Sequence, residues 1–431
     1  MKISKVVVIG SGTMGSGIAA QVANAGLQVH LLDLTIEIAT QACERIKKSR
    51  PPLLMEENNL NHIIPGSIEN DMETLKDADW VVEAVVERID IKKTLYSKID
   101  TLRKPGALVS SNTSSIPLKV LTEDMSKEMK EVFCITHFFN PVRYMRLLEL
   151  VIGPQNDKEK INDLVNFGDK ILGKTVVVCN DSPGFLGNRV GVYAMQVAMT
   201  EAFNYGLTVE EADAVFGRPL GIPKTGIFGL YDLIGIDLMA DVLKSLIKEL
   251  PISDPFHIVG KQLPIINQLI EDGYTGRKGK GGFFRMNKSS DVKILESLNY
   301  KNNTYHESKK VDLGLPDVMD VVNVIERDDV YGKYAWSIIK KTILYASSLV
   351  PDVTTNFNDI DDAMKCGFNW SKGPFEILDE IGIENFISKL NQDEEIPSFI
   401  KQLIDQKNSL FKTTDNALEY FHPQQSYMPS I

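Results

Sequence analysis

A histidine and a glutamate stand in unusual surroundings between residues 137 and 150, where the sequence reads HFFNPVRYMRLLEL. His137 comes just before two phenylalanines, and Glu149 follows twelve residues later inside an apolar run. An unpaired carboxylate in such a run is costly, so we expect Glu149 to be neutral or to have a partner. A histidine oriented by a buried carboxylate is a recurring general base, because the carboxylate holds the imidazole tautomer and stabilises the imidazolium ion.

The partner of Glu149 stays open at this point. His137, Arg143 and Arg146 are all candidates. In the catalytic interpretation, Glu149 orients His137, which then accepts the proton of a substrate hydroxyl. In the structural interpretation, His137 is a satisfied core residue and Glu149 pairs with Arg146. Spacing alone does not decide between them.

A glycine-rich turn near the amino terminus predicts a dinucleotide site. Residues 6–33 contain a short β-branched run, then Gly10, Gly12 and Gly15 in the order G-x-G-x-x-G, then an alanine-rich helical stretch and a second strand ending in Asp33. This is the full context in which the motif binds a pyrophosphate at a helix N-terminus. Asp33 can accept hydrogen bonds from ribose hydroxyls and would repel a 2′-phosphate, so NAD is favoured over NADP. The alternative is a glycine turn in an α/β domain that binds no ligand.

Strands and helices alternate after this turn, which predicts a doubly wound, mostly parallel α/β sheet of the Rossmann-like kind. The expected strands cover 80–85, 107–111, 131–136, 147–152 and 175–179, and the expected helices cover 35–49, 89–102 and 157–171. Ligands of such sheets bind beyond the carboxyl ends of the strands. This rule selects Glu83, Glu87, residues 111–115 and His137. Residues 111–115 (SNTSS) also fit a polar turn with a helix cap.

Composition limits the classes of protein to which the chain can belong. Its 431 residues exceed one ordinary domain, and its net charge of −11 without single-sign runs argues against nucleic acid or an anionic membrane as the main partner. The four cysteines form no CxxC pair, which indicates a reducing, cytoplasmic compartment. The six histidines show no metal-ligand spacing, and we expect no bound metal. We also expect no signal peptide and no membrane insertion.

Taken together, the motifs resemble those of the 3-hydroxyacyl-CoA dehydrogenase family. They are, in order, GSGTMGSGIA from Gly10, WVVEAVVE at 80–87, SNTSS at 111–115, HFFNPV at 137–142, LLEL at 147–150, DSPGFLGNR at 181–189 and GRKGKGGFF at 276–284. The resemblance implies an NAD-dependent enzyme that oxidises L-3-hydroxyacyl-CoA to 3-ketoacyl-CoA in fatty-acid β-oxidation.

The resemblance also implies roles for individual residues. His137 would be the general base and Glu149 its orienting partner. Ser114 would hydrogen-bond the substrate's 3-oxygen, Asn188 would lie near the reacting carbon, and Asn140 would help shape the same site. NAD would be held by Gly10, Gly12, Thr13, Met14, Gly15, Asp33, Glu87, Lys92 and Asn112. The family often has a second proline and a valine after HFFNPV, whereas here Arg143, Tyr144 and Met145 follow, so acyl chain length stays open.

The second half of the chain is expected to be helical and to contain a repeat. FGLYDLIGID at 228–237 matches FEILDEIGIE at 375–384 with an offset of 147 positions, and Asp213-Ala214 matches Asp362-Ala363 with an offset of 149. This predicts an all-α domain in two copies, the second degenerate. The expected boundaries are 1–183 for the NAD-binding domain, 184–286 for the first helical copy, 287–316 for a linker with a small hairpin, and 317–431 for the second copy.

This organisation resembles the dehydrogenase part of long bacterial bifunctional proteins that also carry an enoyl-CoA hydratase domain, which is absent here. It implies that the internal repeat replaces a homodimer partner, so that the chain is monomeric. Either a hydratase or a thiolase is a separate partner, or this chain is one part of a larger product. Two rivals are a non-catalytic NADH-binding protein and a dehydrogenase of free hydroxy acids. The first would have lost the base or the carboxylate, and the second would use a lysine base in another motif.

Overall fold

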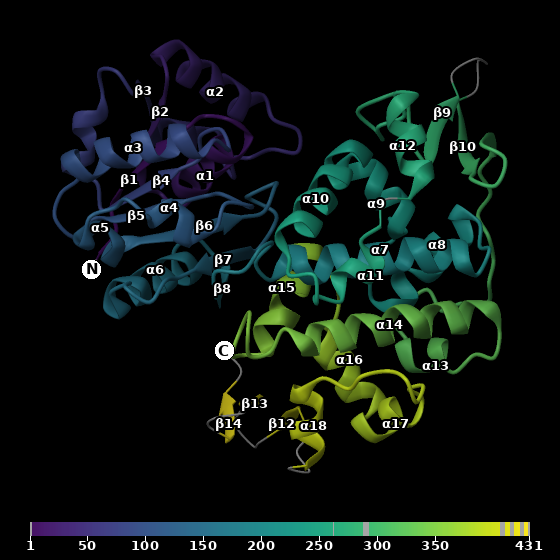
Figure 1. The fold of residues 1–431 in the computed structure, drawn as a ribbon. Helices are drawn as coiled ribbons and strands as arrows, with labels where there is room; N and C mark the ends of the chain where they lie inside the picture. Colours follow the sequence, from purple (N-terminus) through teal and green to yellow (C-terminus); the bar gives the residue numbers. More distant parts are fainter. Residues whose placement is uncertain are drawn as a thin grey trace. The chain divides into compact units, whose positions relative to one another are not determined.

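The computed structural model describes residues 2–261, 263–287, 293–405, 410–413, 418–422 and 426–429. The chain forms two compact units, Met1–Leu186 and Gly187–Ile431 (Figure 1). Among the helices of the described residues, none combines the length and the apolar character needed to cross a lipid bilayer.

The first unit is built on an eight-stranded sheet with the order β3-β2-β1-β4-β5-β6-β7-β8. Neighbouring strands are parallel except β6 and β7, which are antiparallel. The strands are β1 (Lys5–Ile9), β2 (Gln28–Asp33), β3 (Ile63–Ser67), β4 (Trp80–Glu83), β5 (Leu108–Ser111), β6 (Phe133–Phe138), β7 (Leu147–Val151) and β8 (Thr175–Cys179). The helices are α1 (Thr13–Asn24), α2 (Ile36–Lys48), α3 (Ile89–Leu102), α4 (Leu118–Thr122), α5 (Lys127–Val132) and α6 (Lys158–Lys170), with 3₁₀ turns η1 (Glu57–His62) and η2 (Met72–Lys76).

Both faces of this sheet are covered because side chains alternate along each strand. One core includes Val8 of β1 and Trp80 of β4 and packs against α1 and α6, where Phe167 meets the Trp80 ring edge-on at 5.7 Å. On the other face, Tyr96 of α3 packs edge-on against Phe133 of β6 at 5.0 Å. The expected Rossmann-like α/β architecture is therefore confirmed.

The strand registers place several polar side chains on the α3 face. Glu83 pairs with Ser111 across β4 and β5, and His137 pairs with Glu149 across β6 and β7. The helix expected at 89–102 is confirmed as α3. The strand expected at 131–136 instead runs from Phe133 to Phe138, so His137 lies within β6 and not after it.

The second unit consists mainly of helices. They are α7 (Gly187–Asn204), α8 (Val209–Val215), η3 (Arg218–Leu220), α9 (Gly226–Ile234), α10 (Ile236–Glu249), α11 (Phe256–Val259), α12 (Pro264–Glu271), α13 (Val321–Ile325), α14 (Val330–Ser348), α15 (Asn358–Phe368), α16 (Pro374–Ile381), α17 (Ile383–Ser388) and α18 (Ser398–Asp405). The unit also contains two three-stranded antiparallel sheets, of order β11-β10-β9 and β12-β13-β14. Their strands are β9 (Phe284–Asn287), β10 (Ile294–Asn299), β11 (Thr304–Glu307), β12 (Phe411–Thr413), β13 (Leu418–His422) and β14 (Ser426–Pro429).

These strands correct the expectation of an all-α second half. The hairpin expected in the linker is confirmed as β10–β11, but β9 extends it to a sheet that also bonds to the helices. The Ser297 hydroxyl of β10, for example, donates to the Glu210 carboxylate of α8.

Two aspartates, Asp213 half-buried and Asp361 buried, make similar contacts in the helical segments. Asp213 accepts the main-chain N–H groups of Phe228 and Gly229 at 2.7 and 3.0 Å. Asp361 accepts those of Phe375 and Glu376 at 2.8 and 2.9 Å. The repeat in the sequence matches Asp213 with Asp362. In the structure, the equivalent contacts are made by Asp361, one residue earlier.

A second pair of aspartates joins helices to the small sheets. Asp232 of α9 accepts the N–H groups of Phe283 and Phe284 just before β9. Asp379 of α16 accepts those of Leu410 and Phe411 at the start of β12. Each helical segment is thus tied by one aspartate to a three-stranded sheet that follows it.

Candidate active site

His137 and Glu149 form a buried pair in the first unit. The antiparallel register of β6 and β7 places them directly opposite each other, where side chains of neighbouring strands meet. The imidazole Nδ1 lies 2.6 Å from Glu149 Oε2. Glu149 is completely buried, and its Oε1 accepts the main-chain N–H of Leu186 at 2.9 Å. Because the carboxylate accepts from Nδ1, the Nε2 atom is the ring nitrogen that can take a proton from a substrate.

The contacts of His137, Arg143 and Arg146 show which of these side chains pairs with Glu149. The imidazole lies 4.7 Å from the Phe139 ring and 5.6 Å from the Phe185 ring, centroid to centroid. Arg143 donates instead to the carbonyl oxygen of Leu54 at 2.6 Å, so its guanidinium is directed to the loop after α2. Arg146 bonds to Thr175 Oγ1 at 3.4 Å. The partner of Glu149 is therefore the histidine, as the catalytic interpretation requires.

The glycine turn before α1 has room for a dinucleotide. Gly10 has a φ of 101°, and a Cβ atom there would lie 2.5 Å from the carbonyl oxygen of Ala84. A Cβ on Gly15 would collide with the Gly10 carbonyl group, whereas a Cβ on Gly12 would meet nothing within 4 Å. Gly12 caps α1 without a side chain, so the first N–H groups of the helix face open space. These features fit a pyrophosphate bound at the helix N-terminus.

A cavity of about 810 Å³ adjoins this turn. Gly10, Gly12, Thr13, Met14 and Asp33 line it together with apolar side chains of α2 and α3. The Asp33 carboxylate is oriented by the N–H of Ser11 at 2.6 Å and by that of Leu34 at 2.7 Å. The donor groups, the apolar walls and the acid at the end of β2 suit the adenosine half of NAD.

The ends of β4, β5 and β6 are joined by hydrogen bonds. Glu87, after β4, accepts from Ser115 Oγ at 2.9 Å and also from Thr113 Oγ1. Asn112 Oδ1 accepts the N–H of Phe138 at 3.0 Å. Ser114 lies exposed between these anchored neighbours. The alternative of a polar turn describes the local bonding well, and the same bonding fixes the loop that carries Ser114.

Lys92 has surroundings that the sequence did not reveal. Its side chain is 1% exposed, and its Nζ bonds to both Glu83 oxygens at 2.8 and 2.9 Å and to Glu87 Oε2 at 3.1 Å. Burial alone would raise the pKa of Glu87, but Lys92, Thr113 and Ser115 outweigh it and hold that pKa below its usual value. The only signal in the sequence was a buried strand ending in a glutamate, with a lysine in the next helix.

Two other predicted residues are placed as follows. Asn140 is exposed in the turn between β6 and β7. Asn188 is half-buried in the first turn of α7, in the second unit. Their roles stay predictions.

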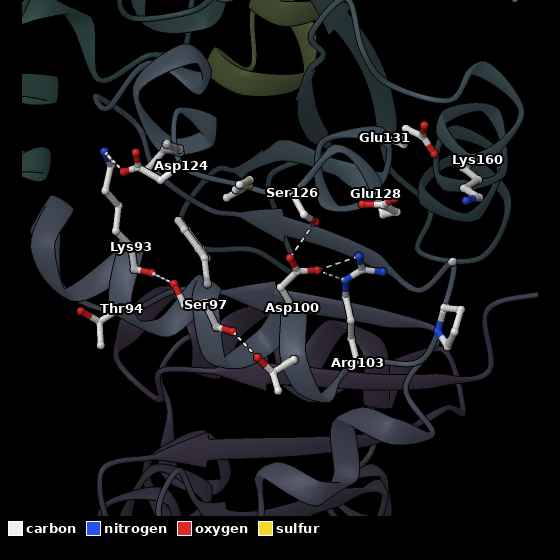
Figure 2. Close-up of a pocket in the computed structure, with 16 residues that line it drawn as sticks. Lys93, Thr94, Ser97, Asp100, Arg103, Asp124, Ser126, Glu128, Glu131 and Lys160 are labelled. Carbon is white, nitrogen blue, oxygen red and sulfur yellow. Dashed lines mark hydrogen bonds and ion pairs between the residues drawn. The ribbon is translucent and has the colours of Figure 1, made fainter.

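The first unit also has a larger groove of about 1010 Å³, between α3 and the segment containing α4 and α5 (Figure 2). Several of its polar side chains pair with one another: Asp100 binds Arg103 at 2.8 Å and Ser126 at 2.7 Å, and Lys93 binds Asp124 at 2.6 Å. The groove is lined by these pairs and not by the described residues that were predicted to act on a substrate. Size alone therefore does not identify the active site.

Comparison with known proteins identifies the first unit and the first part of the second. Residues 5–182 match the NAD binding domain of 3-hydroxyacyl-CoA dehydrogenase, and residues 184–286 match its C-terminal domain. Over 94% of this chain and all of the other, the fold is similar to the crystal structure of 3-hydroxybutyryl-CoA dehydrogenase from Escherichia coli K12, with a TM-score of 0.73 and 23% identity.

Two curated relatives have similar sequences. A putative fatty acid oxidation complex trifunctional enzyme of Rickettsia felis is 44% identical over 88% of this chain, which spans only 53% of that protein. A probable 3-hydroxyacyl-CoA dehydrogenase of Deinococcus radiodurans is 37% identical over 68% of this chain and 86% of its own length. The chain thus spans about half the length of the first relative and most of the second. It belongs to the 3-hydroxyacyl-CoA dehydrogenase family of NAD-dependent oxidoreductases.

Proposed function

We propose that this chain oxidises L-3-hydroxyacyl-CoA to 3-ketoacyl-CoA with NAD, as a step of fatty-acid β-oxidation. The observation that supports this most directly is the 2.6 Å contact between His137 Nδ1 and Glu149 Oε2, in the unit that also carries the dinucleotide turn. The pairing leaves Nε2 to act on a substrate hydroxyl. NAD, when bound, supplies the acceptor for the hydride that leaves C3.

The residues of the chain would handle the proton and orient the substrate. His137 Nε2 takes the proton of the 3-hydroxyl group as the C3 hydride departs, and the imidazolium that forms is stabilised by Glu149. Ser114 would hydrogen-bond the 3-oxygen, and Asn140 would help shape the same site. In the reverse direction, His137 returns the proton to the 3-oxygen, so reduction consumes a proton and is favoured at lower pH.

The test is NADH oxidation by the purified chain with acetoacetyl-CoA, with a long-chain 3-ketoacyl-CoA and with free acetoacetate. Turnover with either thioester, and much less with the free acid, is the expected result, and the ratio of the two thioesters ranks chain length. Efficient turnover of the free acid would favour a hydroxy acid dehydrogenase instead. Bound NADH without turnover of any substrate would contradict the proposal.

We also propose that the second helical segment is a duplicate of the first. The recurrent aspartate contacts and the three-stranded sheet after each segment support this. Helices α7 and α14 would be equivalent, and they pack together: the Tyr193 and Tyr345 rings stack at 3.9 Å, and Ser337 bonds to Glu201 at 2.9 Å. Such a pairing within one chain would replace a homodimer. A monomeric mass by sedimentation is expected, and a stable dimer would contradict it.

The relative from Rickettsia felis is named a trifunctional enzyme of a fatty acid oxidation complex. We therefore propose that an enoyl-CoA hydratase or a thiolase works with this chain. Transfer of intermediates between purified proteins, measured as a shortened lag before NADH appears, would test the partnership.

A further inference from the structure

Glu83 carries an unusual number of hydrogen bonds for a residue outside the proposed reaction. It ends β4 and is completely buried. Its Oε2 accepts from the Tyr96 hydroxyl at 2.5 Å and from Ser111 Oγ at 2.7 Å. Its Oε1 accepts the main-chain N–H of Val85 at 2.8 Å, and both oxygens bind Lys92. Burial and the Glu83 carboxylate raise the pKa of Tyr96, so this hydroxyl remains a donor.

The fold brings these partners together from separate elements. The β4–β5 register sets Ser111 beside Glu83, and α3 presents Lys92 and Tyr96 one turn apart on the face that covers the sheet. A buried carboxylate is tolerated only when it is paired and hydrogen-bonded, and here the partners meet that condition. An apolar residue at the end of β4 would make a simpler core, so stability alone does not explain Glu83.

The contacts of Glu83 lead to the proposed cofactor site by two routes. Its bond to the Val85 N–H shapes the turn after β4, and Ala84 and Val85 of that turn line the cavity beside Gly10. Its ion pair with Lys92 holds the ammonium group that binds Glu87 at 3.1 Å.

Glu87 in turn reaches the substrate side. Its Oε1 binds Thr113 and Ser115, the residues that flank Ser114. Through these contacts, the buried Glu83 influences the orientation of the partly exposed Glu87 carboxylate and of the 113–115 loop.

We propose that Glu83 is a positioning residue, which acts through Lys92 to hold Glu87 and the 113–115 loop in the geometry that binds cofactor and substrate. This inference rests on the proposed function. It assigns Glu83 no contact with either ligand, and of the two routes it gives the effect to the one through Lys92 and Glu87.

The test is a double-mutant cycle with Glu83→Gln and Glu87→Gln, read out as the dissociation constant of NADH by fluorescence and as KM and kcat with acetoacetyl-CoA. Glutamine keeps the shape of Glu83 and removes its charge. We expect Glu83→Gln to weaken NADH binding about tenfold and to raise KM more than it lowers kcat. In the Glu87→Gln background, the same substitution should change NADH affinity less than twofold.

Equal losses in both backgrounds would overturn the proposal, because Glu83 would then act independently of Glu87. A lowered unfolding temperature with unchanged NADH affinity would also overturn it, since Glu83 would be purely structural. Wild-type NADH binding and turnover in the same assay establish the proposed function separately.

Two further variants guard against loss of folding and against surface effects. Tyr96→Phe removes one hydrogen bond to Glu83 and no charge, and it should weaken NADH binding two- to threefold, again only when Glu87 is present. Glu123→Gln is the matched control. Glu123 lies at the end of α4, is 68% exposed and binds Lys93, the residue next to Lys92 on α3, at 2.8 Å. It should leave NADH affinity and turnover unchanged, and a tenfold loss there would overturn the assignment to Glu83.

Discussion

Glu83 and Glu149 are two carboxylates buried in one sheet with different partners. Both are completely buried, and each accepts one main-chain N–H group. Glu149 binds His137 across the antiparallel pair of strands, whereas Glu83 binds Lys92 from the covering helix. Both arrangements therefore satisfy a buried charge with a nitrogen group and a backbone donor.

The two partners differ in what they can do with a proton. An imidazole changes its charge near neutral pH, so a His–Glu pair can accept and return a proton during a reaction. The Lys92 ammonium group instead bonds to both Glu83 and Glu87, so this pair holds neighbouring groups in place. We infer that the first pair would perform chemistry and the second would position residues, and the following variants test this difference.

The largest effect is expected for His137→Ala. Removing the general base should lower kcat by about 10⁴-fold, because no other group would take the hydroxyl proton. NADH affinity should stay within twofold of the wild type, since His137 does not line the dinucleotide cavity. Stopped-flow NADH oxidation and fluorescence titration measure the two quantities, and a collapse of NADH affinity would show that the residue is misplaced.

Glu149→Gln should come next. The imidazole remains, but the amide neither fixes its tautomer well nor stabilises the imidazolium ion, so kcat should fall by about 10³-fold. KM for acetoacetyl-CoA should change little. If kcat stayed within tenfold of the wild type, Glu149 would be a structural partner only.

Lys92→Met, combined with Glu83→Gln so that no buried charge is left unpaired, should change the pH dependence of NADH binding. In the wild type the pKa of Glu87 is held below its usual value. The contribution of the ionised Glu87 carboxylate to NADH affinity is therefore present above this lowered pKa, and it is lost as the pH falls through it. Without Lys92, burial raises the pKa of Glu87. The midpoint of the affinity loss should then move upward, as measured by fluorescence titration between pH 4 and 8. An unchanged midpoint would argue that Glu87 does not contribute through its charge.

Ser114→Ala should have a smaller effect. The loss of one hydrogen bond to the 3-oxygen, worth about 1.4 kcal/mol, corresponds to roughly a tenfold fall in kcat/KM. NADH affinity should be unaffected, because the neighbouring Thr113 and Ser115 still bind Glu87. Steady-state kinetics with acetoacetyl-CoA would show the change, and an unaltered kcat/KM would remove Ser114 from the site.

The smallest effect is expected in the groove of Figure 2. Asp124→Asn breaks the surface ion pair with Lys93, in which Asp124 is 70% exposed. Exposed pairs contribute about 0–1 kcal/mol, so turnover should remain within twofold and the unfolding temperature should change by only a few degrees. A large loss of turnover would mean that the groove takes part in function.

The features that the sequence determined are those that local patterns encode. The glycine spacing before an alanine-rich helix predicted the dinucleotide turn, and the alternation of apolar runs with amphipathic stretches predicted β1, α1, β2 and α3 within a residue or two. Such patterns are visible because a strand or helix of sufficient length repeats its period several times. Among the strands of the second unit, the sequence predicted the hairpin β10–β11, whereas β9 and β12 to β14 were missed.

Only the tertiary structure decided which charged groups meet. The sequence offered three partners for Glu149, and the antiparallel register of β6 and β7 selected His137. The family resemblance implied a cofactor role for Lys92, but its pairing with Glu83 depends on how α3 packs on the sheet. Local propensity determines where a strand or helix forms, whereas the partner of a buried charge depends on contacts between elements far apart in the chain, which no local pattern encodes.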